Sequence, residues 1–175
     1  MSGIETEHLR LLPYSPTQLL ALIADAREFE EAFGFPAAEG MQGFLRSDDV
    51  SPAWLARLRE AKTADPWEHG FAVLHRDSRS VIGSAAFKGP PDPDGVVEIA
   101  YGIVPEYQSR GYATEAAKAL LDFAFASDDV RLVRAHTRAE PNASTRVLTK
   151  CGFQLTGDVI DPEDGLVWRW ERARL

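Results

Sequence analysis

The chain has 175 residues, of which 45% are hydrophobic and 26% are charged, as is typical of one globular domain, here residues 1–175. It has no run of about 18 apolar residues, which excludes a membrane span, and its charged N-terminal segment excludes a secretory signal. The single cysteine, Cys151, excludes a disulfide framework and a multi-cysteine metal site. We therefore expect a cytoplasmic protein.

The charge balance is acidic, because 19 lysines and arginines stand against 27 aspartates and glutamates, for a net charge of −8. Non-specific nucleic-acid binding requires a basic surface, so we expect no nucleic-acid partner. A solvated surface is the favoured interpretation of the acidic clusters, and a field that attracts cationic amines is the alternative. The clusters lie at Glu28–Glu31, Asp48–Asp49, Asp128–Asp129 and Asp158–Asp164.

In chain order, the first half of the sequence predicts an extended segment, two helices and three strands. Ser15-Pro16-Thr17-Gln18 is typical of a helix start, with Ser15 as the N-cap. Residues 27–50 carry no recognisable motif and are predicted to be a loop. The extended segment covers residues 4–12, the second helix opens at Ser51-Pro52, and the strands are Phe71–Arg76, Val81–Lys88 and Val96–Val104.

The second half predicts two helices and three strands. Apolar residues recur at helical spacing from Gly111 to Ala126, and Gly152 is a stop signal for a helix over Asn142–Lys150. The strands are Arg131–Arg138, Phe153–Ile160 and Leu166–Arg172, the last two joined by an acidic loop. The order β-α-α-β-β-β-α-β-α-β-β predicts a mixed α/β domain with one sheet and helices on its faces.

A strand-loop-helix segment carries the pattern Gln-x-x-Gly-x-Ala, at Gln108, Gly111 and Ala113. Small residues let a ligand approach the backbone closely. The first N–H groups of the following helix have no partner within the helix and favour an anion such as a phosphate. Arg110 adds a positive charge to the loop. The spacing alone leaves an ordinary strand-to-helix turn equally open.

This segment resembles the acetyl-CoA-binding motif of the GNAT superfamily of N-acetyltransferases, Gln/Arg-x-x-Gly-x-Gly/Ala after the fourth strand. A second block, Asn142 to Phe153, resembles the Asn-x-x-Ser…Lys-x-Gly-Phe segment of the subgroup that contains the ribosomal-protein N-terminal acetyltransferases. The opening Thr6-Glu7-His8-Leu9-Arg10-Leu11 is typical of the same subgroup. The resemblance implies a mostly antiparallel sheet of six to seven strands with about four helices.

The resemblance also implies how acetyl-CoA, as co-substrate and without a metal, would be held. Backbone amides of Gly102, Ile103 and Val104 would bind the thioester and pantetheine. Asn142 would contact the pantetheine or the cofactor loop, and a role as helix N-cap is equally weighted and compatible. The pyrophosphate would lie on loop amides of Gln108, Ser109, Arg110, Gly111, Tyr112, Ala113 and Thr114.

Glu98 is the candidate general base, because it is a lone carboxylate in an apolar strand. Strand alternation places it on one face with Ala100 and Gly102, and partial burial would raise its pKa toward the range of a base. The resemblance supports this role. The alternative is a solvated carboxylate or an ion pair with Arg134 or Arg138. Gly102 lies about 13 Å along the strand from Glu98, which favours a water relay.

The protonation of the leaving thiolate is less clear in this sequence. Many superfamily members carry a tyrosine where this chain has Leu148, and Ser144 is the substitute suggested by the subgroup. The alternative for Ser144 is a hydroxyl bonded to local backbone. Cys151 is interpreted as a core thiol, and His136 as a solvated or ion-paired ring rather than a catalytic one.

The sequence therefore predicts an acetyl-CoA-dependent N-acetyltransferase that transfers acetyl directly to a primary amine in a ternary complex. A protein N-terminal α-amine is the favoured acceptor. The alternatives are a small-molecule amine, such as a polyamine or an antibiotic, and a non-catalytic acetyl-CoA-binding module. A homodimer stays an open alternative. The acceptor site could be lined by aromatic residues for which core packing is, in at least half of the cases, the favoured role, namely Phe33, Phe35, Trp54 and Trp67.

Overall fold

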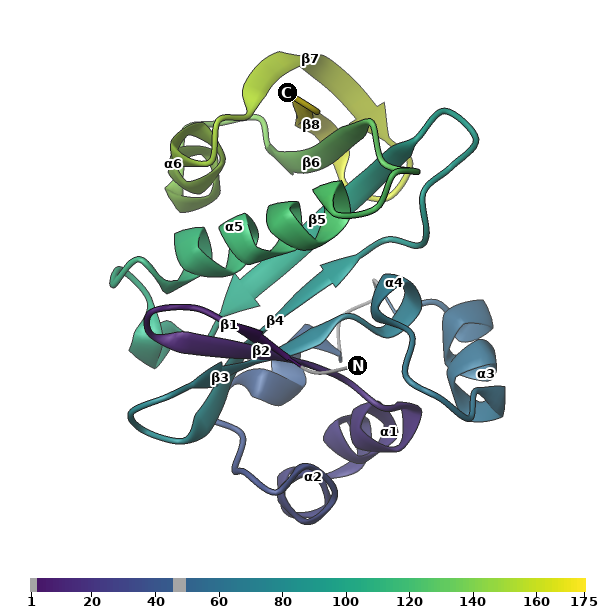
Figure 1. The fold of residues 1–175 in the computed structure, drawn as a ribbon, viewed down its shortest axis with the longest axis vertical. Helices are drawn as coiled ribbons and strands as arrows, with labels where there is room; N and C mark the ends of the chain where they lie inside the picture. The colour runs from purple at the N-terminus through teal and green to yellow at the C-terminus, as the bar shows by residue number, and fades with distance from the viewer. Residues whose placement is uncertain (1–2, 46–49) are drawn as a thin grey trace.

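A computed structural model describes residues 3–45 and 50–175, and within these the chain forms an eight-stranded sheet of order β1-β2-β3-β4-β5-β6-β8-β7 (Figure 1). Neighbouring strands are antiparallel except for the parallel pair β5 and β6. The mixed, mostly antiparallel sheet predicted from the sequence is thus confirmed. The strands are β1 Ile4–Glu5, β2 Leu9–Pro13, β3 Phe71–His75, β4 Ser80–Phe87, β5 Val96–Ile103, β6 Leu132–Arg138, β7 Gln154–Asp161 and β8 Gly165–Ala173.

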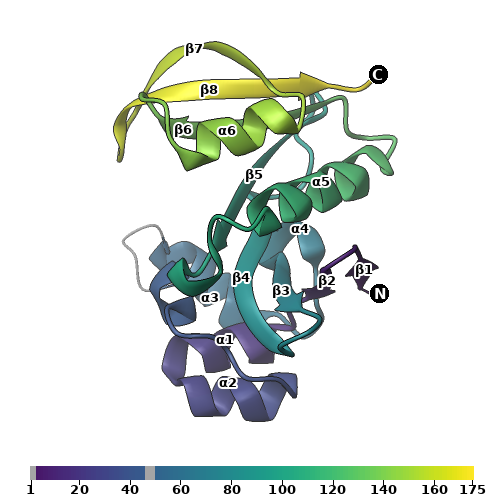
Figure 2. The same ribbon diagram turned by 90° about the vertical axis from the view of Figure 1, so that its left-hand side faces the viewer.

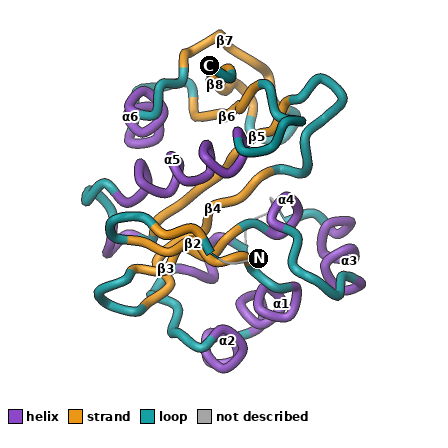
Figure 3. The backbone as a smooth tube through the Cα atoms, in the orientation of Figure 1, coloured by secondary structure: helices purple, strands orange, loops and turns teal. Residues whose placement is uncertain are grey.

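The helices form two groups around the sheet (Figures 2 and 3). Helix α5 (Tyr112–Phe125) packs on β2, β4 and β5 and also contacts α6 (Ala143–Lys150). The N-terminal helices lie at the end of the molecule away from the β6–β8–β7 part of the sheet. They are α1 Pro16–Ala24, α2 Ala26–Phe33, α3 Pro52–Glu60, α4 Pro66–His69 and the 3-10 turn η1 Met41–Phe44, and a second 3-10 turn, η2 Pro105–Tyr107, follows β5.

Local signals in the sequence explain most helix boundaries. Ser15 caps α1 in a reciprocal arrangement with Gln18, as predicted, and Asn142 caps α6 in the same way with Thr145. The prediction of a loop over residues 27–50 was wrong in part, because α2 occupies its first turns between the N-cap Asp25 and the left-handed Gly34. The predicted acidic cluster Asp48–Asp49 lies outside the described residues.

The predicted N-terminal extended segment is two strands joined by a turn, and the short helix α4 was also not predicted. Both differences come from brief elements whose length is below what hydrophobic periodicity detects. The core lies between the sheet and its helices, and it includes Leu148, fully buried, and Cys151, 5% exposed. The core role expected for Cys151 is confirmed.

The parallel strands β5 and β6 pair for only a short distance and then separate. Their register runs from Val96 opposite Leu132 to Glu98 opposite Arg134. Beyond these residues β5 continues to Ile103 along β4, while β6 continues to Arg138 along β8. The sheet therefore opens into a V whose two walls are the C-terminal halves of β5 and β6.

Candidate active site

The β5 wall of the V presents main-chain polar groups. In an antiparallel ladder, alternate residues bond to the partner strand. Val104 donates its N–H to the Ile82 carbonyl at 2.8 Å, so the same alternation turns the N–H groups of Tyr101 and Ile103 away from β4, toward the opening. The Ile103 carbonyl accepts a hydrogen bond from Gln108 Nε2 at 2.8 Å. Amides for a thioester are thus offered by Tyr101 and Ile103.

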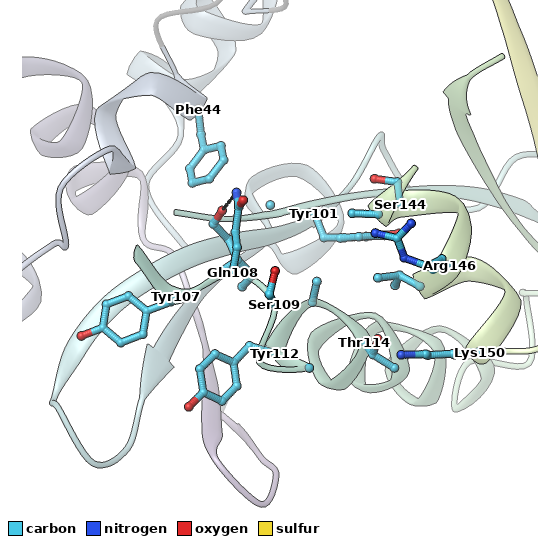
Figure 4. A pocket seen from close by; sticks show the side chains of 16 residues that line it. Phe44, Tyr101, Tyr107, Gln108, Ser109, Tyr112, Thr114, Ser144, Arg146 and Lys150 are labelled. Carbon is cyan, nitrogen blue, oxygen red and sulfur yellow. Dashed lines mark hydrogen bonds between the residues drawn. The ribbon is translucent and has the colours of Figure 1, made fainter. Parts of the chain in front are cut away.

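A cavity of about 480 Å³ fills the mouth of the V, between β5, the N-terminus of α5 and one face of α6 (Figure 4). Eight of the eleven residues predicted to bind the cofactor line it. Its lining is Phe44, Tyr101, Gly102, Ile103, Tyr107, Gln108, Ser109, Gly111, Tyr112, Ala113, Thr114, Ala143, Ser144, Arg146, Val147 and Lys150.

The other three predicted cofactor residues lie outside that lining. Val104 is fully buried and its N–H is bonded within the sheet. Arg110 is exposed, with its guanidinium 5.5 Å from the centre of the Tyr107 ring. The Asn142 side chain accepts from Thr145 N at 2.9 Å, which is the N-cap role weighed from the sequence.

The loop between β5 and α5 has the backbone of an anion-binding turn. Ser109 has φ 63° and Gly111 has φ 86°, both left-handed, and Gly111 is the N-cap of α5 without a capping side chain. The N–H groups of Tyr112, Ala113 and Thr114 belong to the first turn of α5. They lie at the cavity and have no acceptor within the helix. With the positive end of the helix dipole, they can bind a phosphate.

Two cations from α6 face the same cavity, and sequence reasoning missed them. Arg146 and Lys150 are four residues apart and share a helix face with Ala143 and Val147. Figure 4 shows both side chains on the α6 side of the cavity. The helical spacing of 143, 146, 147 and 150 would have identified this face. The cavity thus combines helix N–H groups with positive side chains, as a phosphate-rich ligand requires.

Tyr101 and Ser144 bring two hydroxyl groups together in the site. Burial raises the pKa of Tyr101 well above its ordinary value, the nearby Cys151 adds to this, and a hydrogen bond with the Ser144 side chain acts in the opposite direction. The Tyr101 hydroxyl therefore keeps its proton at neutral pH. Many superfamily members have a tyrosine at the position of Leu148. In this chain Tyr101, on β5, brings a tyrosine hydroxyl to the site, and this was not predicted from the sequence.

Gly102 lies where Phe44 crosses the β5 wall. A Cβ built on Gly102 would lie 2.5 Å from Phe44 Cε1, so any larger residue would displace this ring. The aromatic residues predicted for the acceptor site, Phe33, Phe35, Trp54 and Trp67, instead pack against the core. Phe44, from η1, is the aromatic residue of the N-terminal half that reaches the cavity lining.

Glu98 lies on the opposite face of β5 from Tyr101 and belongs to a charged cluster. Its Oε2 atom is 2.9 Å from Lys88 Nζ and 3.1 Å from His136 Nδ1. The sequence predicted Arg134 or Arg138 as an ion-pair partner of Glu98. Arg134 instead bonds to Glu171 at 2.7 Å. His136 Nε2 accepts from Arg169 Nε at 3.2 Å. Glu98 is not in the cavity lining; it sits at the apex of the V.

The acidic tip between β7 and β8 approaches this cluster. Asp161 Oδ1 accepts the N–H groups of Glu163 and Asp164, and these hydrogen bonds hold the pKa of Asp161 below its ordinary value. The Lys88 pKa is raised, because Glu98, Asp161 and Asp164 outweigh the opposing and individually largest effect of burial. The tip is therefore close enough to act on the charges around Glu98.

The acetyltransferase (GNAT) domain model matches residues 8–154. The chain belongs to the GNAT acetyltransferase family. The resemblance predicted from the Gln108–Ala113 and Asn142–Phe153 blocks is thus confirmed. None of the described helices of this GNAT domain is long and apolar enough to cross a membrane.

Its relatives include the uncharacterised N-acetyltransferase YjdG of Bacillus subtilis (strain 168), 28% identical over 101 residues, 58% of this chain and 58% of that protein. The ribosomal-protein-S5-alanine acetyltransferase of Vibrio fischeri superposes with a TM-score of 0.66 at 16% identity over 99% and 97% of the two chains. RimL, a ribosomal L7/L12 α-N-protein acetyltransferase in complex with coenzyme A, gives 0.65 and 16% over 98% of each. These likenesses establish the GNAT fold.

Proposed function

We propose that this GNAT protein transfers the acetyl group of acetyl-CoA directly to a primary amine. The observation that carries the proposal is the V between β5 and β6, whose free β5 amides lead to the N-terminus of α5. A thioester carbonyl between the Tyr101 and Ile103 amides would have donors for the oxyanion of the tetrahedral intermediate. The helix N–H groups, Arg146 and Lys150 would hold the phosphates.

The chain's own groups suffice for each remaining step. An amine must lose its proton before it attacks, and the Glu98 cluster lies at the apex of the V. The leaving thiolate can take a proton from Ser144, which lies near the Tyr101 hydroxyl. Cys151 is 5% exposed in the core, which argues against a covalent acetyl-enzyme.

A protein N-terminal α-amine is the favoured acceptor, because both ribosomal-protein acetyltransferases described above share the fold over nearly the whole chain. A cationic small molecule is the second candidate, and the acidic tip at Asp161–Asp164 is the observation that favours it. A non-catalytic acetyl-CoA-binding module is the remaining alternative.

The test is an acceptor screen that follows release of free thiol from acetyl-CoA. The panel holds peptides with free N-terminal alanine or serine, the same peptides acetylated at the N-terminus, spermidine and kanamycin. Acetyl-CoA should also raise the melting temperature by mass action. Thiol release only with free amines supports the proposal. A melting shift without turnover of any amine would support the binding module instead.

A further inference from the structure

The cluster around Glu98 contains a histidine whose tautomer the hydrogen bonds define. Arg169 Nε carries a proton and donates it to His136 Nε2 at 3.2 Å. Nε2 of the neutral ring is therefore the acceptor, and the ring proton is on Nδ1. Nδ1 lies 3.1 Å from Glu98 Oε2 and donates to it. A carboxylate that orients an imidazole in this way leaves the Nε2 lone pair pointing away from it.

We propose that His136 is the group that takes the proton from the acceptor amine, and that Glu98 is a positioning residue that orients the ring. The inference rests on the proposed acetyltransferase function. Glu98 Oε2 already accepts from both Lys88 and His136, so this oxygen is engaged in holding the ring. The Nε2 atom of His136 has one long hydrogen bond, to Arg169, which a water molecule that contacts the amine can replace.

The position of His136 along its strand brings the base closer to the thioester. Because Glu98 is level with Arg134, His136 is level with Ala100, two residues nearer the open end of the V. The distance along the strand to the level of Gly102 falls from about 13 Å for Glu98 to about 7 Å for His136. Because Nε2 faces Arg169 on β8, a bridging water would carry the proton across the remaining gap, as in the relay expected for Glu98.

Charged groups of both signs surround the His136 ring. The acidic ones are Glu98 on β5 and Asp161 at the end of β7. The basic ones are Arg169 on β8 and Lys88 after β4, and Arg134 is paired with Glu171 alongside. The His136 side chain is 21% exposed, so solvent can remove the proton between turnovers.

In the proposed step the neutral Nε2 atom accepts, through a bridging water, a proton from the ammonium form of the acceptor. The freed nitrogen lone pair forms the N–C bond to the acetyl carbonyl, whose oxygen becomes the oxyanion. Collapse of this intermediate breaks the C–S bond, and the second amine proton leaves to solvent. The thiolate takes a proton from Ser144, which regains one from solvent, and His136 returns its proton to water.

Two variants separate His136 from Glu98 in pH profiles of kcat/KM, measured with the best acceptor of the panel above. His136→Asn keeps a donor near the Nδ1 position but removes Nε2. We expect kcat to fall about 10²–10⁴-fold near neutral pH and the acidic limb to disappear. Glu98→Ala removes the carboxylate without offering a competing amide. We expect a smaller fall, with the limb retained and moved to lower pH, because a negative charge that favours the protonated ring is lost.

Arg134→Lys is the matched control, because Arg134 shares the strand and face of His136 and lysine keeps a positive charge beside Glu171. Its acidic limb should match the wild type. An acidic limb that survives in His136→Asn overturns the proposal, and so does a limb that is lost in Glu98→Ala, which would return the role of base to Glu98. A wild type that acetylates no amine contradicts the proposed function instead.

The tautomer gives a readout that needs no acceptor. Long-range ¹H–¹⁵N spectra of the labelled protein should show a histidine that is protonated at Nδ1 and unprotonated at Nε2 and whose signal is missing in His136→Asn. His8, whose Nδ1 lies 3.0 Å from Glu115 Oε2, should keep its Nδ1 proton in both proteins. The chain has four histidines, so the assignment is practical. A neutral His136 protonated at Nε2 would overturn the proposal, because its lone pair would then face Glu98.

Discussion

Tyr101 and Ser144 come from β5 and α6, and Ser144 is close enough to act on the pKa of the Tyr101 hydroxyl, which predicts that they act as a unit. If Ser144 protonates the thiolate, Ser144→Ala should lower kcat by about 10-fold. This loss is smaller than is usual for a general acid, because a thiol is already acidic and its thiolate leaves readily. Tyr101→Phe should lower kcat less. The double variant should be no slower than Ser144→Ala alone, since residues of one unit are not additive. Steady-state kinetics of the three variants provide the measurement.

Additive losses in that double variant would mean that the two hydroxyl groups act separately.

Some single residues of the site could be predicted from the sequence and others could not. Glu98 stood out as a lone carboxylate in an apolar strand. Its partners Lys88 and His136 did not, because they come from segments 10 and 38 positions away, and strand pairing alone brings them within 3.1 Å.

At the scale of elements, the N-terminus of α5 is the feature to test. Gly111→Asp should leave the helix formed, because aspartate can adopt the left-handed backbone of Gly111, and its carboxylate would place a negative charge at the proposed phosphate site. Gly111→Asn has the same shape and tolerates the left-handed backbone, without the charge. By calorimetry, we expect acetyl-CoA to bind at least about tenfold more weakly to the aspartate variant than to the asparagine variant. This ratio corresponds to about 1.4 kcal/mol, a modest energy for the repulsion of two negative charges at this distance.

Equal affinity of the aspartate and asparagine variants would contradict a phosphate site at this helix end. The loop motif was readable from sequence because its spacing depends on local backbone. The α6 face with Arg146 and Lys150 follows from helical periodicity as well. That this face meets the α5 N-terminus depends on the packing of α5 against α6.

A second element-scale prediction concerns Glu115, which ties the turn between β1 and β2 to α5. Burial alone would raise the pKa of its carboxyl, but hydrogen bonds from the Thr6 hydroxyl and the His8 backbone N–H outweigh it and hold the pKa below its ordinary value. Such a group stabilises the fold above its unfolded-state pKa, and the contribution is lost as pH falls through the folded-state pKa. Glu115→Gln should lower the free energy of unfolding by about 1.5–3 kcal/mol at neutral pH.

Urea unfolding at two pH values measures this effect. The difference between the variant and the wild type should shrink as the pH falls below the ordinary range of a glutamate carboxyl, about 4.3. Glu140→Gln, at an exposed position, should leave the free energy of unfolding unchanged at both values. A pH-independent loss in Glu115→Gln would assign the effect to packing. The same contacts give the Thr6-Glu7-His8 segment a structural role, because they join the turn between β1 and β2 to α5.

At the scale of the whole molecule, the net charge of −8 and the acidic tip predict how acceptors are attracted. Asp161→Asn with Glu163→Gln and Asp164→Asn removes the charge and keeps an acceptor oxygen for the turn N–H groups. The KM for spermidine should rise several-fold at low salt and the difference should shrink toward 0.5 M salt, because screening acts within about 10 Å already at 0.1 M. The KM for acetyl-CoA should change little. A salt-independent KM for spermidine would reduce the tip to a solvated loop.

The sequence by itself indicated the family, through the resemblance of two motif blocks, and most of the sheet, through period-2 and helical patterns and caps. Each of these signals is read within one segment. Tertiary structure decided which groups meet. The separation of β5 from β6 beyond Glu98 exposes the Tyr101 and Ile103 amides, while Val104 stays bonded to Ile82. Parallel pairing and the β8 register bring Glu98, His136 and Arg169 into one chain of hydrogen bonds. Such contacts join residues distant in sequence, and no local pattern encodes them.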